Sequence, residues 1–184
     1  LMVFSGPAGT GKDTVLECFA AKKMKGVWKS VSYTTRQPRE NEKDGVDYHF
    51  ITREEFERLI KDGAMLEYAK YGLNYYGTPK APVDEHLKNG DTVILKIEVQ
   101  GARQIKALYP DAVGVFVLPP SLEVLEKRLR GRGSETDEDV IRRLSIAKKE
   151  LEYSVNYEYR IVNDDLDDAV NDLYSIVRSL QLKQ

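Results

Sequence analysis

Cysteine is almost absent from this 184-residue sequence, which contains Cys18 and no other. A single thiol excludes an internal disulfide and indicates a reducing compartment. The sequence also lacks a run of 18 or more apolar residues, and it does not open with a basic segment, an apolar stretch and a small-residue cleavage site. We therefore expect a cytoplasmic protein with no membrane-spanning helix. Because the sequence begins inside the apolar run LMVFS, we also expect further residues upstream.

Neither sign of charge is in excess, since 28 Lys and Arg face 30 Asp and Glu, for a net charge of −2. This balance argues against generic binding to nucleic acid or to a membrane surface, so any positively charged site must be local. The 41% of hydrophobic residues suit one globular domain that buries a core. The oligomeric state leaves no signal in the sequence.

Short β-rich runs alternate with amphipathic helical patterns along most of the sequence. The predicted strands are residues 1–5, 28–34, 92–97, 113–118 and 159–162. The predicted helices are residues 12–24, 99–108, 122–130, 137–153 and 166–180. This order is typical of an α/β fold in which helices flank a parallel sheet, and the loop described below makes it a P-loop NTPase type of core.

Two segments depart from the alternation. Residues 33–82 are polar, rich in tyrosine and interrupted by glycine around one helical pattern at 53–61, which predicts an inserted lobe. Residues 121–145 carry the charged stretch RLRGRGSETDEDVIRRL, which breaks at Gly131 and Gly133 and is typical of a mobile, helical lid. We expect one domain, residues 1–184, whose core segments are 1–32, 83–120 and 146–184.

The stretch SGPAGTGKDT follows the first predicted strand and opens the first predicted helix. Its glycines let the backbone turn tightly and point several N–H groups into one concavity, at the positive end of the helix. The alternative is an ordinary glycine-rich turn, but the preceding strand and the GK ending favour a phosphate-binding loop. The expected ATP-binding residues of this loop are Gly6, Pro7, Ala8, Gly9, Thr10, Gly11, Lys12, Asp13 and Thr14.

Asp13 stands where the pattern GxxxxGK calls for Ser or Thr, whose hydroxyl ligates Mg²⁺. The helix dipole favours a carboxylate in the first turn, so Asp13 is locally acceptable. Two alternatives stay open for the metal. Asp13 binds it through water, or Asp13 turns aside and Thr14 offers its hydroxyl.

A second group of polar residues lies in SYTTRQPRENEKDGVDYHF and LEYAKYGLNYYGTP. Arg36 and Arg39 flank a proline in an expected loop, and guanidinium groups bind phosphate in bidentate fashion. The alternative for this pair is a solvated surface. Glu67 lies among apolar and aromatic residues, where a carboxylate beside a base-sized pocket can accept two parallel hydrogen bonds.

Together with GPAGTGK, ILKIEVQGA, the charged stretch and IVNDD, these motifs resemble guanylate kinases over essentially the whole sequence. The resemblance implies a lobe that binds GMP, a lid with arginines that closes over ATP, and Mg²⁺ as the cofactor. The GMP residues that it implies are Ser32, Arg36, Arg39, Tyr48, Glu67, Tyr76, Thr78 and Glu98. It also implies that Arg132 and Arg143 are the lid arginines and that Asn163 lies near adenine.

The implied reaction is transfer of the γ-phosphoryl group of ATP to GMP, and to dGMP as well. Guanine presents N1–H and its 2-amino group side by side to Glu67, whereas adenine offers an acceptor at N1 and no 2-amino group. The groups expected to act on the moving phosphoryl group are Lys12, Arg36, Arg39, Arg132 and Arg143. The acceptor is already a phosphate oxygen, so no general base is needed, and we interpret His49 and His86 as surface or packing residues.

Three residues depart from the family pattern. Asp13 replaces a small residue, Lys96 stands where an acidic residue is common, and Ala8 replaces a frequent Ser. Three other functions remain as alternatives. They are a peptide-binding module like the guanylate-kinase-like domains of scaffold proteins, a kinase for AMP or a pyrimidine nucleotide, and a GTP-hydrolysing switch. The complete phosphate-binding loop argues against the peptide-binding module, and Glu67 with Ser32 and Thr78 argues against a kinase for another nucleotide. The lack of an NKxD-like motif argues against the GTP-hydrolysing switch.

Overall fold

The computed structural model of the chain describes residues 1–131 and 136–182. Arg132, which the sequence predicts to be a lid arginine, lies outside the described residues. The chain divides into two compact units. We call Leu1 with Gly26–Ala112 the central unit, and Met2–Lys25 with Val113–Gln184 the terminal unit.

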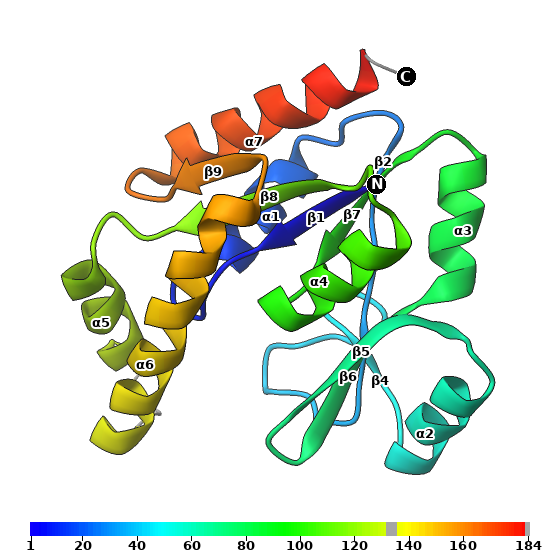
Figure 1. Cartoon of the computed structure of the whole chain (residues 1–184), viewed down its shortest axis with the longest axis horizontal. Coiled ribbons are helices and arrows are strands. Elements are labelled where there is room, and N and C mark those ends of the chain that lie inside the picture. The colour runs from blue at the N-terminus through cyan, green and yellow to red at the C-terminus, as the bar shows by residue number, and fades with distance from the viewer. Residues whose placement is uncertain (132–135, 183–184) are drawn as a thin grey trace. The chain divides into compact units, whose positions relative to one another are not determined.

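In the described residues of the terminal unit, three strands pair in parallel, and helices accompany them (Figure 1). Strand β8 (Val113–Leu118) lies between β1 (Met2–Ser5) and β9 (Tyr159–Val162), with Met2 opposite Val113 and Val115 opposite Tyr159. The helices are α1 (Lys12–Ala21), α5 (Leu122–Arg130), α6 (Asp137–Tyr153) and α7 (Leu166–Gln181), with one 3-10 turn at Ser154–Asn156.

Hydrophobic burial explains why these elements form. All four residues of β1 are buried, as expected for a strand covered on both faces, and Val115, Phe116 and Val117 of β8 are buried beside them. Helix α7 buries apolar residues at helical spacing and packs against α1. Each large apolar side chain removed from water contributes about 1.5–3 kcal/mol before conformational entropy is subtracted.

The central unit contains two groups of strands. Strand β2 (Val27–Lys29) pairs in parallel with β7 (Thr92–Lys96), and α3 (Lys80–Lys88) and α4 (Val99–Leu108) belong to the same part of the chain. A separate four-stranded sheet has the order β4-β3-β6-β5. Its strands are β3 (Tyr33–Thr34), β4 (His49–Phe50), β5 (Met65–Tyr71) and β6 (Asn74–Pro79), and α2 (Arg53–Lys61) follows β4.

The predicted α/β class, with helices flanking a parallel sheet, is confirmed, and the helices at 53–61, 99–108, 122–130 and 137–153 have the predicted bounds. The single strand predicted at 28–34 is wrong. The backbone N–H of Ser30 still donates to the Ile94 carbonyl of β7, so the chain stays beside β7 up to this residue. Tyr33 instead pairs with His49 and Gly77, which belong to the other sheet, and the predicted strand is therefore divided in two.

Helix α3 was not predicted from the sequence. Pro82 interrupts its helical pattern, yet proline is tolerated in the first turn because the N–H groups there have no partner within the helix. The predicted helix at 12–24 also ends earlier, at Ala21, and Lys23 adopts a positive φ of 49° just beyond it. None of the helices in residues 1–131 and 136–182 is long and apolar enough to cross a membrane.

Candidate functional site

The glycine-rich loop of the terminal unit connects β1 to α1. Gly6, Gly9 and Gly11 adopt φ values of 150°, 89° and 81°, which L-residues rarely adopt. A side chain at Gly6 would approach the Val117 carbonyl oxygen to 2.6 Å, so the loop fits closely over β8. The Thr10 hydroxyl donates to the Pro7 carbonyl at 2.9 Å and closes the turn. Lys12 is buried and is the first residue of α1. Because the loop leads directly into this helix, its N–H groups lie at the positive end of the helix dipole.

Asn163 and Arg128 hold the far side of this loop. The Asn163 side chain donates to the Thr10 carbonyl at 2.7 Å, and Arg128 donates to the Asn163 carbonyl at 3.0 Å. A Cβ atom at Gly11 would collide with the Asn163 amide, so Gly11 and Asn163 fit only as a pair. Arg128 was not among the site residues predicted from the sequence. Its position in RLRGRG was the available signal, but the pattern cannot show which arginine turns toward the loop.

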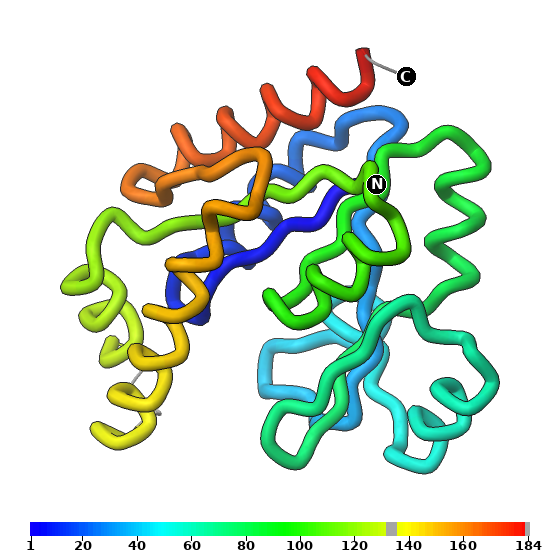
Figure 2. Tube along the Cα trace, viewed as in Figure 1, coloured from blue at the N-terminus to red at the C-terminus, as the bar shows by residue number. Residues whose placement is uncertain are grey.

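Helices α5 and α6 lie side by side in the terminal unit, as Figures 1 and 2 show. Ser121 and Thr136 cap their N-termini by accepting hydrogen bonds from Val124 and Asp139. The helices share a buried apolar cluster against which Ala8 of the loop packs; its members are Leu125, Leu129, Val140 and Ala147. This contact is a physical reason for Ala8, since a methyl group needs no hydrogen-bond partner there. Arg143, the other predicted lid arginine, is half-buried on α6.

Glu67 of β5 is buried, with 5% of its surface exposed, and it lies opposite Thr78 of β6. The Thr78 hydroxyl donates to Glu67 Oε1 at 2.6 Å. Burial raises the pKa of Glu67 to about 7, and the hydrogen bonds from Thr78 offset part of that rise. A buried carboxylate with one oxygen engaged is suited to a ligand that brings its own N–H donors.

Gly101 of α4 lies against the second oxygen of Glu67. A Cβ atom at this position would collide with Oε2 and would lie 3.0 Å from the carboxylate carbon. The helix therefore approaches the carboxylate closely because residue 101 has no side chain. Gly101 belongs to the motif ILKIEVQGA, but its contact with Glu67 could not be predicted, because no spacing rule connects residue 101 with residue 67.

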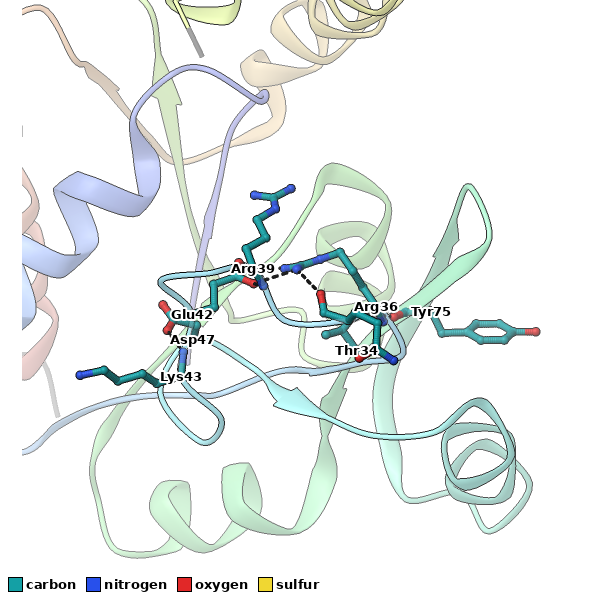
Figure 3. Close-up of polar contacts among 8 residues, drawn as sticks. Thr34, Arg36, Arg39, Glu42, Lys43, Asp47 and Tyr75 are labelled. Atoms are coloured by element: carbon teal, nitrogen blue, oxygen red, sulfur yellow. Dashed lines mark hydrogen bonds and ion pairs between the residues drawn. The ribbon is translucent and has the colours of Figure 1, made fainter. Parts of the chain in front are cut away.

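The loop between β3 and β4 holds the predicted phosphate-binding arginines in different ways (Figure 3). Arg36 forms a bidentate pair with Glu42, with distances of 2.7 Å from Nη1 to Oε2 and 2.9 Å from Nη2 to Oε1. The backbone N–H of Arg39 donates to the same carboxylate at 2.8 Å, while its exposed guanidinium points away from it. Arg36 holds the pKa of Glu42 below its usual value, and Glu42 in turn raises the pKa of Arg36.

Aromatic rings surround this arginine. The guanidinium carbon of Arg36 lies 5.4 Å from the ring centroid of Tyr48 and 5.7 Å from that of Phe50. The rings of Tyr48 and Tyr76 meet edge to face, 6.0 Å apart. Thr34 fixes the start of the loop, since its hydroxyl donates to the Tyr75 carbonyl and accepts from the N–H of Arg36. The structure thus brings Arg36, Tyr48 and Tyr76 together, and sequence reasoning missed Glu42 and Phe50 beside them.

The remaining predicted residues have separate positions. Ser32 is half-buried and its carbonyl accepts from the His49 N–H, while Glu98 is the exposed N-cap of α4. Asp13 and Thr14 are exposed in the first turn of α1. Within the described parts of the chain, no three His, Cys, Asp or Glu side chains gather closely enough to hold a metal ion.

Comparisons with known proteins all lead to guanylate kinases. The family model described as guanylate kinase matches residues 1–180. Guanylate kinase of Synechocystis sp. is 47% identical over 177 residues, which cover 96% of this chain and 92% of the relative. Guanylate kinase of Listeria monocytogenes serovar 1/2a is 48% identical over 183 residues, which cover 100% of this chain and 89% of the relative.

A solved structure has the same fold. The crystal structure of guanylate kinase from Anaplasma phagocytophilum superposes with a TM-score of 0.80 at 34% sequence identity, over 98% of this chain and 85% of that chain. A family match over nearly the whole sequence, relatives at close to half identity and a shared fold all lead to one assignment: the chain belongs to the guanylate kinase family.

Proposed function

We infer that this protein is an enzyme, a nucleoside monophosphate kinase that transfers the γ-phosphoryl group of ATP to GMP and yields ADP and GDP. The observation that carries this inference is the family match across residues 1–180, joined by guanylate kinases at close to half identity. We expect dGMP to serve as a second acceptor.

Glu67 and Thr78 are the proposed readers of the guanine base, together with Ser32. An ionised Glu67 accepts from N1–H and the 2-amino group of guanine, and the Ser32 hydroxyl donates to O6 or N7. The Thr78 hydroxyl donates to Glu67 and holds the carboxylate in place beside the base. The burial of Glu67 and its bond from Thr78 support this role. With adenine in the same place, the carboxylate would face the N1 lone pair, so AMP is rejected by several powers of ten.

Arg36, Arg39, Tyr48 and Tyr76 are the proposed binders of the GMP phosphate. Arg36, Tyr48 and Tyr76 lie together, since the Arg36 guanidinium stands over the Tyr48 ring and that ring contacts the ring of Tyr76. This arrangement supports a ligand that all three share. Arg39 contributes its exposed guanidinium to the same phosphate. Glu98, at the N-terminus of α4, is proposed to face the GMP side of the site.

On the ATP side, Lys12 and the N–H groups of the loop are proposed to hold the β and γ phosphates. Asn163, which braces the Thr10 carbonyl, keeps the loop in its binding shape and lies near the proposed adenine site. Arg132 and Arg143 complete the charge around the transferred group when ATP is bound. The work of the protein is alignment of two anions and neutralisation of charge, because phosphoryl transfer needs little covalent chemistry from side chains.

Mg²⁺ is the proposed cofactor, held mainly by phosphate oxygens and water. Asp13 and Thr14 support this role, since their oxygen-bearing side chains lie in the first turn of α1, next to the glycine-rich loop. When bound, Mg²⁺ neutralises phosphate charge. Asp13 would orient its water ligands, or Thr14 would supply a hydroxyl.

Release of ADP in the presence of ATP and Mg²⁺, with GMP, AMP, CMP or UMP at equal concentration, tests the proposal. Turnover that depends on GMP, with the other acceptors near background, supports it and the role of Glu67 together. GMP binding without turnover would contradict a kinase and favour a binding module, whereas equal turnover with AMP would contradict the proposed base recognition. We further propose a cytoplasmic location and no nucleic-acid partner, from the single cysteine and the balanced charge.

A further inference from the structure

Lys96 is the last residue of β7 and is half-buried. Its ammonium nitrogen lies 5.5 Å from the ring centroid of Tyr48. The guanidinium carbon of Arg36 lies 5.4 Å from the same centroid. Two cations are thus gathered over one tyrosine ring, within the set of side chains proposed to hold the GMP phosphate.

Two cations gathered over one ring favour the binding of an anion between them. Like charges repel more strongly as they leave water, and the attraction of each cation to the face of the tyrosine ring offsets that repulsion only in part. Glu42 provides one negative charge, in a bidentate pair with Arg36. After Glu42, the side chain of Tyr76 also raises the pKa of Arg36, so polar groups converge on this point from several elements.

The charges of five side chains show what Lys96 adds. Arg36, Arg39 and Lys96 are cations and Glu42 and Glu98 are anions, so these residues together carry one net positive charge. The phosphate of a nucleoside monophosphate carries about −1.5 to −2 at neutral pH and is attracted by this charge. With an acidic residue at position 96, the same five positions would carry one net negative charge and would repel the phosphate.

We propose that Lys96 is an additional substrate-binding residue, whose ammonium group donates to the phosphate of the acceptor nucleotide beside Arg36 and Tyr48. This inference rests on the proposed function and adds a specificity for the charged phosphate rather than for the base. The lysine stem is flexible, so the ammonium group can turn from the ring of Tyr48 to the phosphate without movement of the strand.

Equilibrium binding of GMP and of guanosine, measured by calorimetry on the wild type and on Lys96→Met, Lys96→Arg and Lys96→Glu, tests this role. A charge-assisted hydrogen bond corresponds to about tenfold in affinity. We expect Lys96→Met to weaken GMP binding by about that factor, Lys96→Glu to weaken it more, and Lys96→Arg to retain it. Guanosine binding should be the same in all four proteins, because guanosine has no phosphate.

The steady-state constants give a second measurement. Removal of a contact made equally before and during transfer raises KM for GMP and leaves kcat nearly unchanged. Lys88→Met, at the exposed last residue of α3, is the matched control for loss of one lysine charge and should bind GMP like the wild type. Thermal unfolding of each variant shows that it is folded, and Lys96→Gln replaces Lys96→Met if the latter does not fold.

Unchanged GMP affinity in Lys96→Met, or equal losses for GMP and guanosine, would overturn the role of Lys96. A wild type that binds GMP but does not turn it over would contradict the proposed kinase, while the binding series would still decide on Lys96. A wild type that does not bind GMP would overturn both.

Discussion

The affinity for the guanine base should rise with pH as Glu67 ionises. Burial places the pKa of Glu67 at about 7 in the ligand-free protein. Only the ionised carboxylate accepts from both N1–H and the 2-amino group, so binding requires the deprotonated form. With a pKa of about 7, roughly one molecule in eleven is competent at pH 6 and ten in eleven at pH 8, which predicts an increase in affinity of about tenfold.

Guanosine is the appropriate ligand for this measurement, because the GMP phosphate has its own pKa near 6. Calorimetry between pH 6 and pH 8, in buffers of different ionisation enthalpy, should show the increase and the release of a proton on binding below pH 7. Glu67→Gln should bind more weakly with no pH dependence. An affinity of the wild type that is flat across this range would refute the reasoning about burial.

The raised pKa of Glu67 also makes the free energy of unfolding depend on pH, in a direction that can be predicted. Because the folded pKa is raised from 4.5 to about 7, the protonated carboxyl favours the folded state below about pH 4.5, and this contribution is lost as the pH rises through about 7. The difference is on the order of 3 kcal/mol at pH 8. Glu67→Gln should therefore unfold at higher denaturant concentration than the wild type at pH 8, although it binds GMP less well.

Three further substitutions test other parts of the site. Glu42→Gln removes a charge from the pair with Arg36, and we expect a loss of stability of about 1 kcal/mol and a several-fold rise in KM for GMP. Gly101→Ala places a methyl group against Glu67, and we expect a loss of about 1–3 kcal/mol in stability with weaker guanosine binding. Asp13→Ser should change the Mg²⁺ concentration at half-maximal turnover, and an unchanged Mg²⁺ dependence would exclude Asp13 from the metal site.

Matched controls exist for each change. Glu40→Gln neutralises an exposed glutamate in the same loop as Glu42 and should leave KM for GMP as it is. Gln100→Ala changes the exposed residue next to Gly101 on α4, and Glu17→Ser removes an exposed carboxylate from α1. If a control behaves like its test variant, the explanation from specific contacts is wrong.

The order of strands and helices could be predicted because burial imposes a local pattern. The fully buried β1, the helical spacing in α7 and the glycines of the loop all leave signals within a few neighbouring residues. Helix α3 and the break between β2 and β3 could not be predicted. In α3 the proline in the first turn hides the helical pattern, and the break depends on which distant strand each segment pairs with.

The sequence alone predicted which chemical groups this protein brings to a nucleotide. The phosphate-binding loop follows from residue type and spacing, whereas the arginines for the GMP phosphate and the carboxylate for guanine follow from the resemblance to guanylate kinases. Only the tertiary structure decided that Glu42 pairs with Arg36, that Gly101 lets α4 approach Glu67, and that Lys96 lies over the ring of Tyr48. The physical reason is that these contacts join residues on separate elements, so their distances and burial exist only once the chain has folded.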